Sequence, residues 1–132
     1  MNWFYLHAGF MLTASTVLLT AVTVARFFRH KGWWLKGHRR LGLCGVAILA
    51  AGFLAAIVLV SSSGQPHFGS LHPRLGGFTL SGAVLTPVLG FSVFRFPLRA
   101  AGVRRIHRLS GRLTAILTVI TILSGLLLIG IF

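Results

Sequence analysis

The sequence contains no aspartate and no glutamate among its 132 residues, although it carries 13 lysines and arginines. Proton-coupled carriers commonly depend on acidic side chains within the membrane, and channels for hard cations use oxygen ligands. The missing carboxylates therefore argue against both classes of protein. They also mean that a quinol-oxidising site built by this chain alone has only histidine to accept protons.

Cysteine is nearly absent as well, since Cys44 is the only one. A framework of disulfides is therefore excluded, and without a partner cysteine or acid Cys44 makes no metal site. We expect it to be a small, buried apolar residue.

Apolar residues dominate what is present. Hydrophobic types make up 55% of the chain, 16 glycines add to them, and the mean hydropathy is +0.88. An ordinary soluble domain reaches about 45–50% with glycine included. This composition excludes intrinsic disorder and a soluble core of this length, and it predicts a small integral membrane protein that forms one domain over residues 1–132.

Four apolar runs are long enough to cross a bilayer, which takes about 20 residues per helix. The predicted spans are residues 3–24, 41–60, 75–93 and 113–132. Strands are not expected, because the runs lack alternation of apolar and polar residues. With short links, the fold class is an all-α, up-down-up-down transmembrane four-helix bundle.

The basic residues predict the orientation of this bundle. Only Arg74 lies at the middle junction, and both termini lack basic side chains. Because basic loops stay in the cytoplasm, both termini should lie on the outer face of the membrane. If the source is bacterial, that membrane is expected to be the inner membrane of the cell. The other basic residues lie at the first and third junctions: Arg26, Arg29, Lys31, Lys36, Arg39, Arg40, Arg95, Arg99, Arg104, Arg105, Arg108 and Arg112.

Four of the six histidines recur at matching places, near the beginnings of the four spans. The windows HRRLG, HPRLG and HRLSG begin at His38, His72 and His107, and each places glycine four residues after histidine. The window HAGFM at His7 departs from this pattern. We interpret the recurrence as a repeated helix-loop unit.

The alternating direction of the helices puts His7 and His72 near the outer face, and His38 and His107 near the cytoplasmic face. The first and third helices are diagonal neighbours, as are the second and fourth. Each pair can therefore point at the bundle axis from opposite sides at one depth. That is the arrangement of two imidazoles that bind one haem iron from both sides.

Glycine four residues after histidine suits the same hypothesis, because residues four apart lie on one face of a helix. Gly42, Gly76 and Gly111 would let a porphyrin lie flat against the backbone. The alternative is that small residues merely let membrane helices approach closely. That alone accounts for Gly52, Gly82 and Gly125.

The remaining two histidines lie in predicted loops. We expect His30 to face solvent or lipid headgroups. His67 is an alternative to His72 as a ligand, although Pro73, at the predicted first helical position, favours His72 as the residue that enters the helix.

With these motifs, the whole chain resembles cytochrome b561, a di-haem membrane protein, in a minimal four-helix form. The resemblance implies two non-covalent b-type haems that carry electrons across the bilayer, held by His7 with His72 and by His38 with His107. With both axial positions filled by histidine, such a haem transfers electrons rather than activating small molecules. Arg39, Arg74 and Arg108 are candidate partners of the haem propionates, and anionic lipid headgroups are the alternative partners of these arginines.

The favoured function is therefore that of an electron-transfer subunit of a larger redox complex, with no catalytic site of its own evident. Expected partners are redox subunits with acidic faces, anionic lipids and, as a candidate, quinone; nucleic acid is not expected. One alternative is a non-redox pigment-binding or anchor subunit with one histidine per pigment. Another is a soft-metal transporter, which would need clustered histidines.

Overall fold

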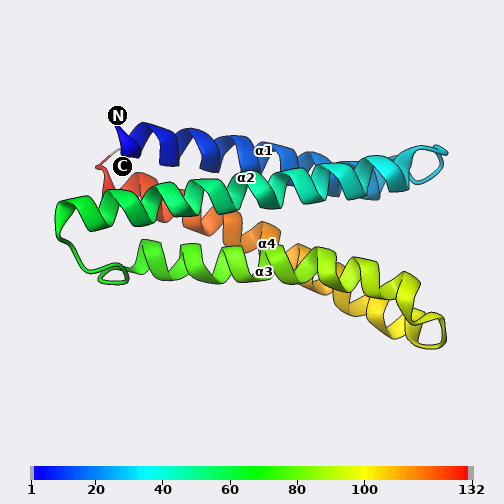
Figure 1. Cartoon of the computed structure of the whole chain (residues 1–132). Helices are drawn as coiled ribbons and strands as arrows, with labels where there is room; N and C mark the ends of the chain where they lie inside the picture. The colour runs from blue at the N-terminus through cyan, green and yellow to red at the C-terminus, as the bar shows by residue number, and fades with distance from the viewer. Residues whose placement is uncertain (1, 131–132) are drawn as a thin grey trace.

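The computed structural model describes residues 2–130 and contains four long α-helices (Figure 1). All four are long and apolar enough to cross a membrane, and the described residues contain no strand. The predicted all-α fold with four spans is confirmed. The elements are α1 (Trp3–Phe27), α2 (Trp34–Ser63), α3 (Leu71–Arg95), the 3-10 turn η1 (Pro97–Arg99) and α4 (Ala100–Leu128).

Local residue chemistry explains several of these ends. Asn2 caps α1, because its side chain accepts a hydrogen bond from the backbone N–H of Phe4 at 3.2 Å. Gly64 ends α2 with a φ of 67°, a left-handed conformation that glycine adopts without steric cost. Pro97 opens η1, the short turn between α3 and α4.

The helices are longer than the predicted spans, and this moves three histidines. The helices begin at Trp34, Leu71 and Ala100, rather than at residues 41, 75 and 113. Hydropathy marks only the part of a helix that lies in hydrocarbon, whereas backbone hydrogen bonding continues beyond it. The three later histidines therefore lie inside α2, α3 and α4 and not in the preceding links. The last two residues of the predicted fourth span, 131–132, lie outside the described residues.

The helices pack as two antiparallel hairpins. Within the described residues, α1 packs along α2 and α3 packs along α4, while contacts between the hairpins are far fewer. The pairs α1–α3 and α2–α4 make no close backbone contact, so they lie diagonally, as predicted. Figure 1 shows the hairpins diverging toward the end that carries the links 28–33 and 96–99. We call this the basic end, and the opposite end, with residues 2, 64–70 and 130, the terminal end.

Small residues allow the close packing inside each hairpin. A Cβ on Gly45 would lie 2.7 Å from Leu18, and one on Gly52 would lie 2.8 Å from Phe10, both on α1. In the other hairpin, a Cβ on Gly82 would lie 2.7 Å from Thr114. Close approach of backbones is the usual role of small residues between membrane helices. The alternative explanation of the glycines is therefore right for Gly52 and Gly82.

Candidate functional site

The four recurring histidines form two facing pairs, one near each end of the bundle. The ring centres of His7 and His72 lie 6.1 Å apart, and those of His38 and His107 lie 6.0 Å apart. In both pairs the ring planes meet at 79°. Each pair joins diagonal helices and therefore takes one histidine from each hairpin.

A backbone carbonyl fixes the tautomer of every one of these rings. His7 Nδ1 donates to Gly52 O at 2.9 Å and His38 Nδ1 donates to Ala21 O at 2.9 Å, across the α1–α2 hairpin. A carbonyl can only accept, so Nδ1 carries the proton and Nε2 keeps a free lone pair. The equivalent bonds of the other hairpin join His72 to Thr121 O at 3.1 Å and His107 to Thr86 O at 2.8 Å.

These distances fit one metal ion between the two rings of each pair. With metal–nitrogen bonds of about 2.0 Å, two imidazoles on opposite sides of an ion have ring centres about 6 Å apart. A hydrogen bond from the second nitrogen to a carbonyl is the usual way in which proteins orient a ligand histidine. The described residues contain no group of three or more metal-ligating side chains, so these donors are paired rather than clustered. A pair of facing imidazoles would suit a metal whose remaining ligands come from a macrocycle.

The hydrogen bonds repeat with one register in all four helices. Each helix offers its accepting carbonyl 14 residues after its own histidine. At 1.5 Å per residue, the two histidine levels are therefore about 21 Å apart along the helices. His7 obeys this register even though its sequence window departs from the others. The four acceptors are Ala21, Gly52, Thr86 and Thr121.

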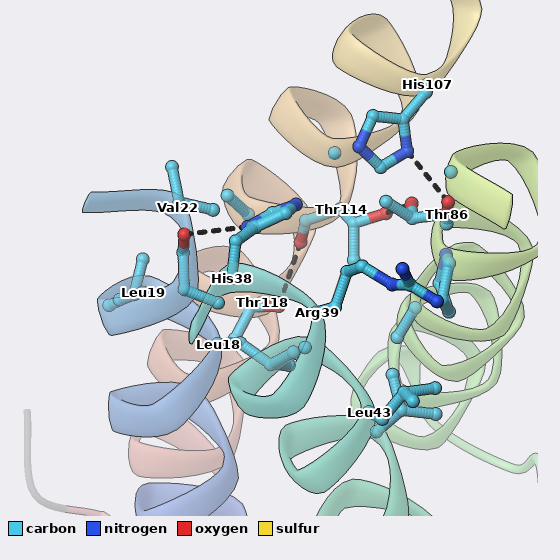
Figure 2. Close-up of a pocket in the computed structure, with 18 of the residues that line it drawn as sticks. Leu18, Leu19, Val22, His38, Arg39, Leu43, Thr86, His107, Thr114 and Thr118 are labelled. Carbon is cyan, nitrogen blue, oxygen red and sulfur yellow. Dashed lines mark hydrogen bonds between the residues drawn. The ribbon is translucent and has the colours of Figure 1, made fainter. Parts of the chain in front are cut away.

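Two cavities lie between the hairpins, and each contains one histidine pair. The terminal-end cavity, around His7 and His72, has a volume of about 1040 Å³. The basic-end cavity, around His38 and His107, has about 120 Å³ and is shown in Figure 2. Cofactor pockets commonly occupy about 300–1,000 Å³ and are mostly apolar, as both linings are here. The smaller cavity lies at the end where the hairpins diverge.

The two cavities adjoin near the middle of the bundle. Ser15 and Thr118 line both of them, and both side chains are buried. Hydroxyl groups also join α3 to α4 beside each cavity: those of Thr79 and Thr121, which line the terminal-end cavity, lie 2.9 Å apart, and those of Thr86, which lines the basic-end cavity, and Ser110 lie 2.7 Å apart. No sequence motif pointed to these contacts.

The glycines that follow the histidines face open space. Gly42 and Gly111 line the basic-end cavity, and Gly76 lines the terminal-end cavity. A Cβ on Gly42 or Gly76 would have no atom within 4 Å, and one on Gly111 would make ordinary contact with Thr86 at 3.6 Å. They therefore do not serve close helix packing, in contrast to Gly45 and its counterparts.

The three candidate arginines differ in position. Arg39 lines the basic-end cavity (Figure 2). Its guanidinium lies 4.7 Å from the ring centre of Phe91 on α3, so it bridges the hairpins. Arg74 instead donates to Phe68 O at 3.0 Å and does not line the terminal-end cavity. Arg108 is exposed and lines neither cavity.

The other singled-out residues lie outside the pairs. His30 is exposed, as expected, and His67 is exposed at the rim of the terminal-end cavity, 3.3 Å from the Ser61 hydroxyl. His72, rather than His67, faces His7. Cys44 was expected to be buried, and this is wrong: it is exposed, because the inward stripe of α2 passes through Gly45.

Comparison with known proteins agrees with this geometry. The family described as eukaryotic cytochrome b561 matches residues 3–132, which is essentially the whole chain. No significant match is found among curated proteins or among solved structures. Together with the four apolar helices, the match shows an integral, multi-pass membrane protein of the haem-dependent electron-transport class. The chain belongs to the cytochrome b561 family.

Proposed function

We propose that this chain transfers electrons across the membrane through two b-type haems, one held by His7 and His72 and the other by His38 and His107. The family implies transmembrane electron transfer with haem. The number of haems, two per chain, and their histidine ligands are what we propose in addition. The observation that carries it is the presence of two facing histidine pairs, with ring centres 6.1 and 6.0 Å apart.

The residues around both proposed haem sites suit electron transfer. When bound, haem supplies an iron that takes up and releases one electron. His7 with His72 and His38 with His107 would hold the two irons, and with two histidines on each iron substrates and oxygen would find no open site on the metal. Gly42, Gly76 and Gly111 leave room beside the rings for a flat macrocycle. The basic-end cavity, at about 120 Å³, is smaller than a haem, and the hairpins that line it make few contacts with each other.

Facing pairs also distinguish this function from the alternatives. A pigment-binding subunit with one histidine per pigment does not need two imidazoles at about 6 Å from each other. Transport of a soft metal requires clustered protein ligands, whereas the donors of residues 2–130 stand in pairs.

Charge suggests the partners of the basic end. Twelve of the 13 lysines and arginines lie there, and the chain has no acidic side chain to neutralise them. Anionic lipid headgroups and an acidic subunit of a redox complex both match this charge. Arg39, at the cavity rim, is the best placed of the candidate arginines for a haem propionate. We also propose quinone as a candidate partner with which the haems exchange electrons.

Electron transfer is tested in vesicles that contain the purified, haem-loaded chain and trapped ferricyanide, with dithionite added outside. We expect ferricyanide reduction well above the leak of protein-free vesicles, because one proposed haem site lies toward each end of the apolar helices. Vesicles containing His107→Ala provide the matched control, since the chain then lacks one of the two proposed sites. Reduction no faster than the leak would contradict the proposal.

The proposed orientation places the basic end in the cytoplasm and both termini outside, following the distribution of basic residues. A reporter fused after Phe132 should therefore show that the C-terminus lies on the outer side of the membrane. In a bacterial host, this membrane is expected to be the inner membrane. A cytoplasmic signal would reverse the assignment of both faces.

A further inference from the structure

We infer that Gly90 and Gly125 are positioning residues that hold the rings of His107 and His72 in line for ligation. This inference rests on the proposed function, because a ring needs alignment only if it binds a metal. Neither glycine belongs to the histidine-glycine windows of the sequence, and each lies on the neighbouring helix of the same hairpin: Gly90 on α3 faces His107, and Gly125 on α4 faces His72.

The distances show how closely these glycines approach the rings. A Cβ on Gly125 would lie 2.9 Å from Cε1 and 3.2 Å from Nδ1 of His72. A Cβ on Gly90 would lie 3.1 Å from Cε1 and 3.3 Å from Nδ1 of His107. In both cases the ring occupies the place of the missing side chain. The ring edge that faces the glycine includes Nδ1, the nitrogen that donates to the carbonyl.

The position of each glycine on its helix explains the contact. Gly90 follows Thr86 by four residues, and Gly125 follows Thr121 by four, and these threonines supply the accepting carbonyls. Residues four apart lie one above the other on one helix face. A side chain longer than a methyl group at the later position would therefore lie over the carbonyl that the ring must reach.

The same register in the N-terminal hairpin carries alanine. Ala25 follows Ala21 by four residues, and Ala56 follows Gly52 by four. Every accepting carbonyl is thus followed, one turn later, by a residue with at most a methyl group. In the C-terminal hairpin a methyl group at Gly125, 2.9 Å from the His72 ring, would force a shift, and one at Gly90, 3.1 Å from the His107 ring, would require the ring to give by a few tenths of an ångström.

A methyl group at position 90 or 125 should therefore displace the ring without harming the helix, because alanine favours helix more than glycine does. The ring would have to lengthen its bond to the carbonyl or move Nε2 out of line with the opposite histidine. Either change alters the axial ligand. Loss of such an orienting contact commonly costs 10–100-fold in metal affinity.

The test uses the full-length, haem-loaded chain in detergent, with the variants Gly125→Ala and Gly90→Ala. Two quantities are measured: the low-spin electron paramagnetic resonance signal of each haem, and the rate of haem loss to excess apomyoglobin. Gly125→Ala should shift the terminal-end signal and speed loss of that haem about 10–100-fold, while the basic-end haem is unchanged. Gly90→Ala should do the reverse, and the unaffected haem reports that the protein is folded.

Two matched controls introduce the same methyl group into open space near each end. A Cβ on Gly9 or on Gly102 would have no atom within 4 Å, so Gly9→Ala and Gly102→Ala should leave both haems unchanged. If the natural chain binds no haem, the proposed function fails. If it binds two, and Gly125→Ala changes neither haem or both equally, the positioning role is overturned.

Discussion

Replacing His107 with alanine is expected to remove the basic-end haem and leave the terminal-end haem in place. The ring of His107 provides one of the two axial nitrogens of that proposed site and lies 6.0 Å from its counterpart, His38. A b-type haem has no covalent bond to the protein, so a single remaining imidazole holds it far more weakly. The purified variant should contain about one haem per chain instead of two.

The fold should survive this change. Alanine is a good helix former, and His107 lies within α4, where its side chain bonds only the carbonyl of Thr86. The spectrum of the remaining haem should match the one lost in His72→Ala, so the two variants together should account for the natural spectrum. His30→Ala and His67→Ala serve as controls and should keep both haems. Retention of both haems in His107→Ala, or loss of both from a folded chain, would show that the pairing is wrong.

Replacing Gly42 with leucine is expected to block the basic-end haem while both of its histidines remain. A Cβ at this position meets no atom within 4 Å, and the residue lines the cavity one turn beyond His38. Leucine would therefore fill the space proposed for the macrocycle without a clash in the haem-free protein. Because leucine also favours helix over glycine by about 0.8 kcal/mol, the helix should not lose stability.

The measurement is the haem content of the purified variant together with its reduced-minus-oxidised spectrum. About one haem per chain is expected, with the spectrum of the terminal-end haem. Gly102→Leu is the matched control, because Gly102 also faces open space but lines neither cavity. If Gly42→Leu kept two haems with natural spectra, Gly42 would not lie beside a macrocycle, and its glycine would need another explanation.

Much of the fold was predictable because the membrane imposes simple rules. Long apolar runs predicted four helices, and the diagonal relation of α1 to α3 and of α2 to α4 followed from short links alone. The same topology brought His7 to His72 and His38 to His107, so the pairing of the rings was predictable from their depth. The first and last residues of the helices were less predictable, because hydropathy does not indicate where a helix ends outside the hydrocarbon.

The contacts that orient the rings could not be predicted from the residue types. Their acceptors are backbone carbonyls, which every residue has, so Ala21 and Gly52 carry no visible signal. Gly125 has the sequence context of an ordinary packing glycine, and only its distance of 2.9 Å to the His72 ring distinguishes it. A search for small residues 18 positions after each histidine would have found it together with Ala25, Ala56 and Gly90.

The arginines show a different limit. The predicted topology put Arg39 and Arg108 toward one end of the bundle and Arg74 toward the other, as in the structure, but the direction of a long side chain depends on its local partners. Arg39 lies over the Phe91 ring beside the cavity, whereas Arg74 turns to the carbonyl of Phe68. A basic residue near a proposed site therefore indicates the sign of the local charge, and not a specific ion pair.

The central claim is that each facing histidine pair holds one haem iron from both sides. The most direct test is the haem count of the purified chain, combined with electron paramagnetic resonance of its oxidised form. The account predicts about two b-type haems per chain, both low-spin with two imidazole ligands. A chain without haem, a count of one, or a high-spin iron with an open axial position would contradict it.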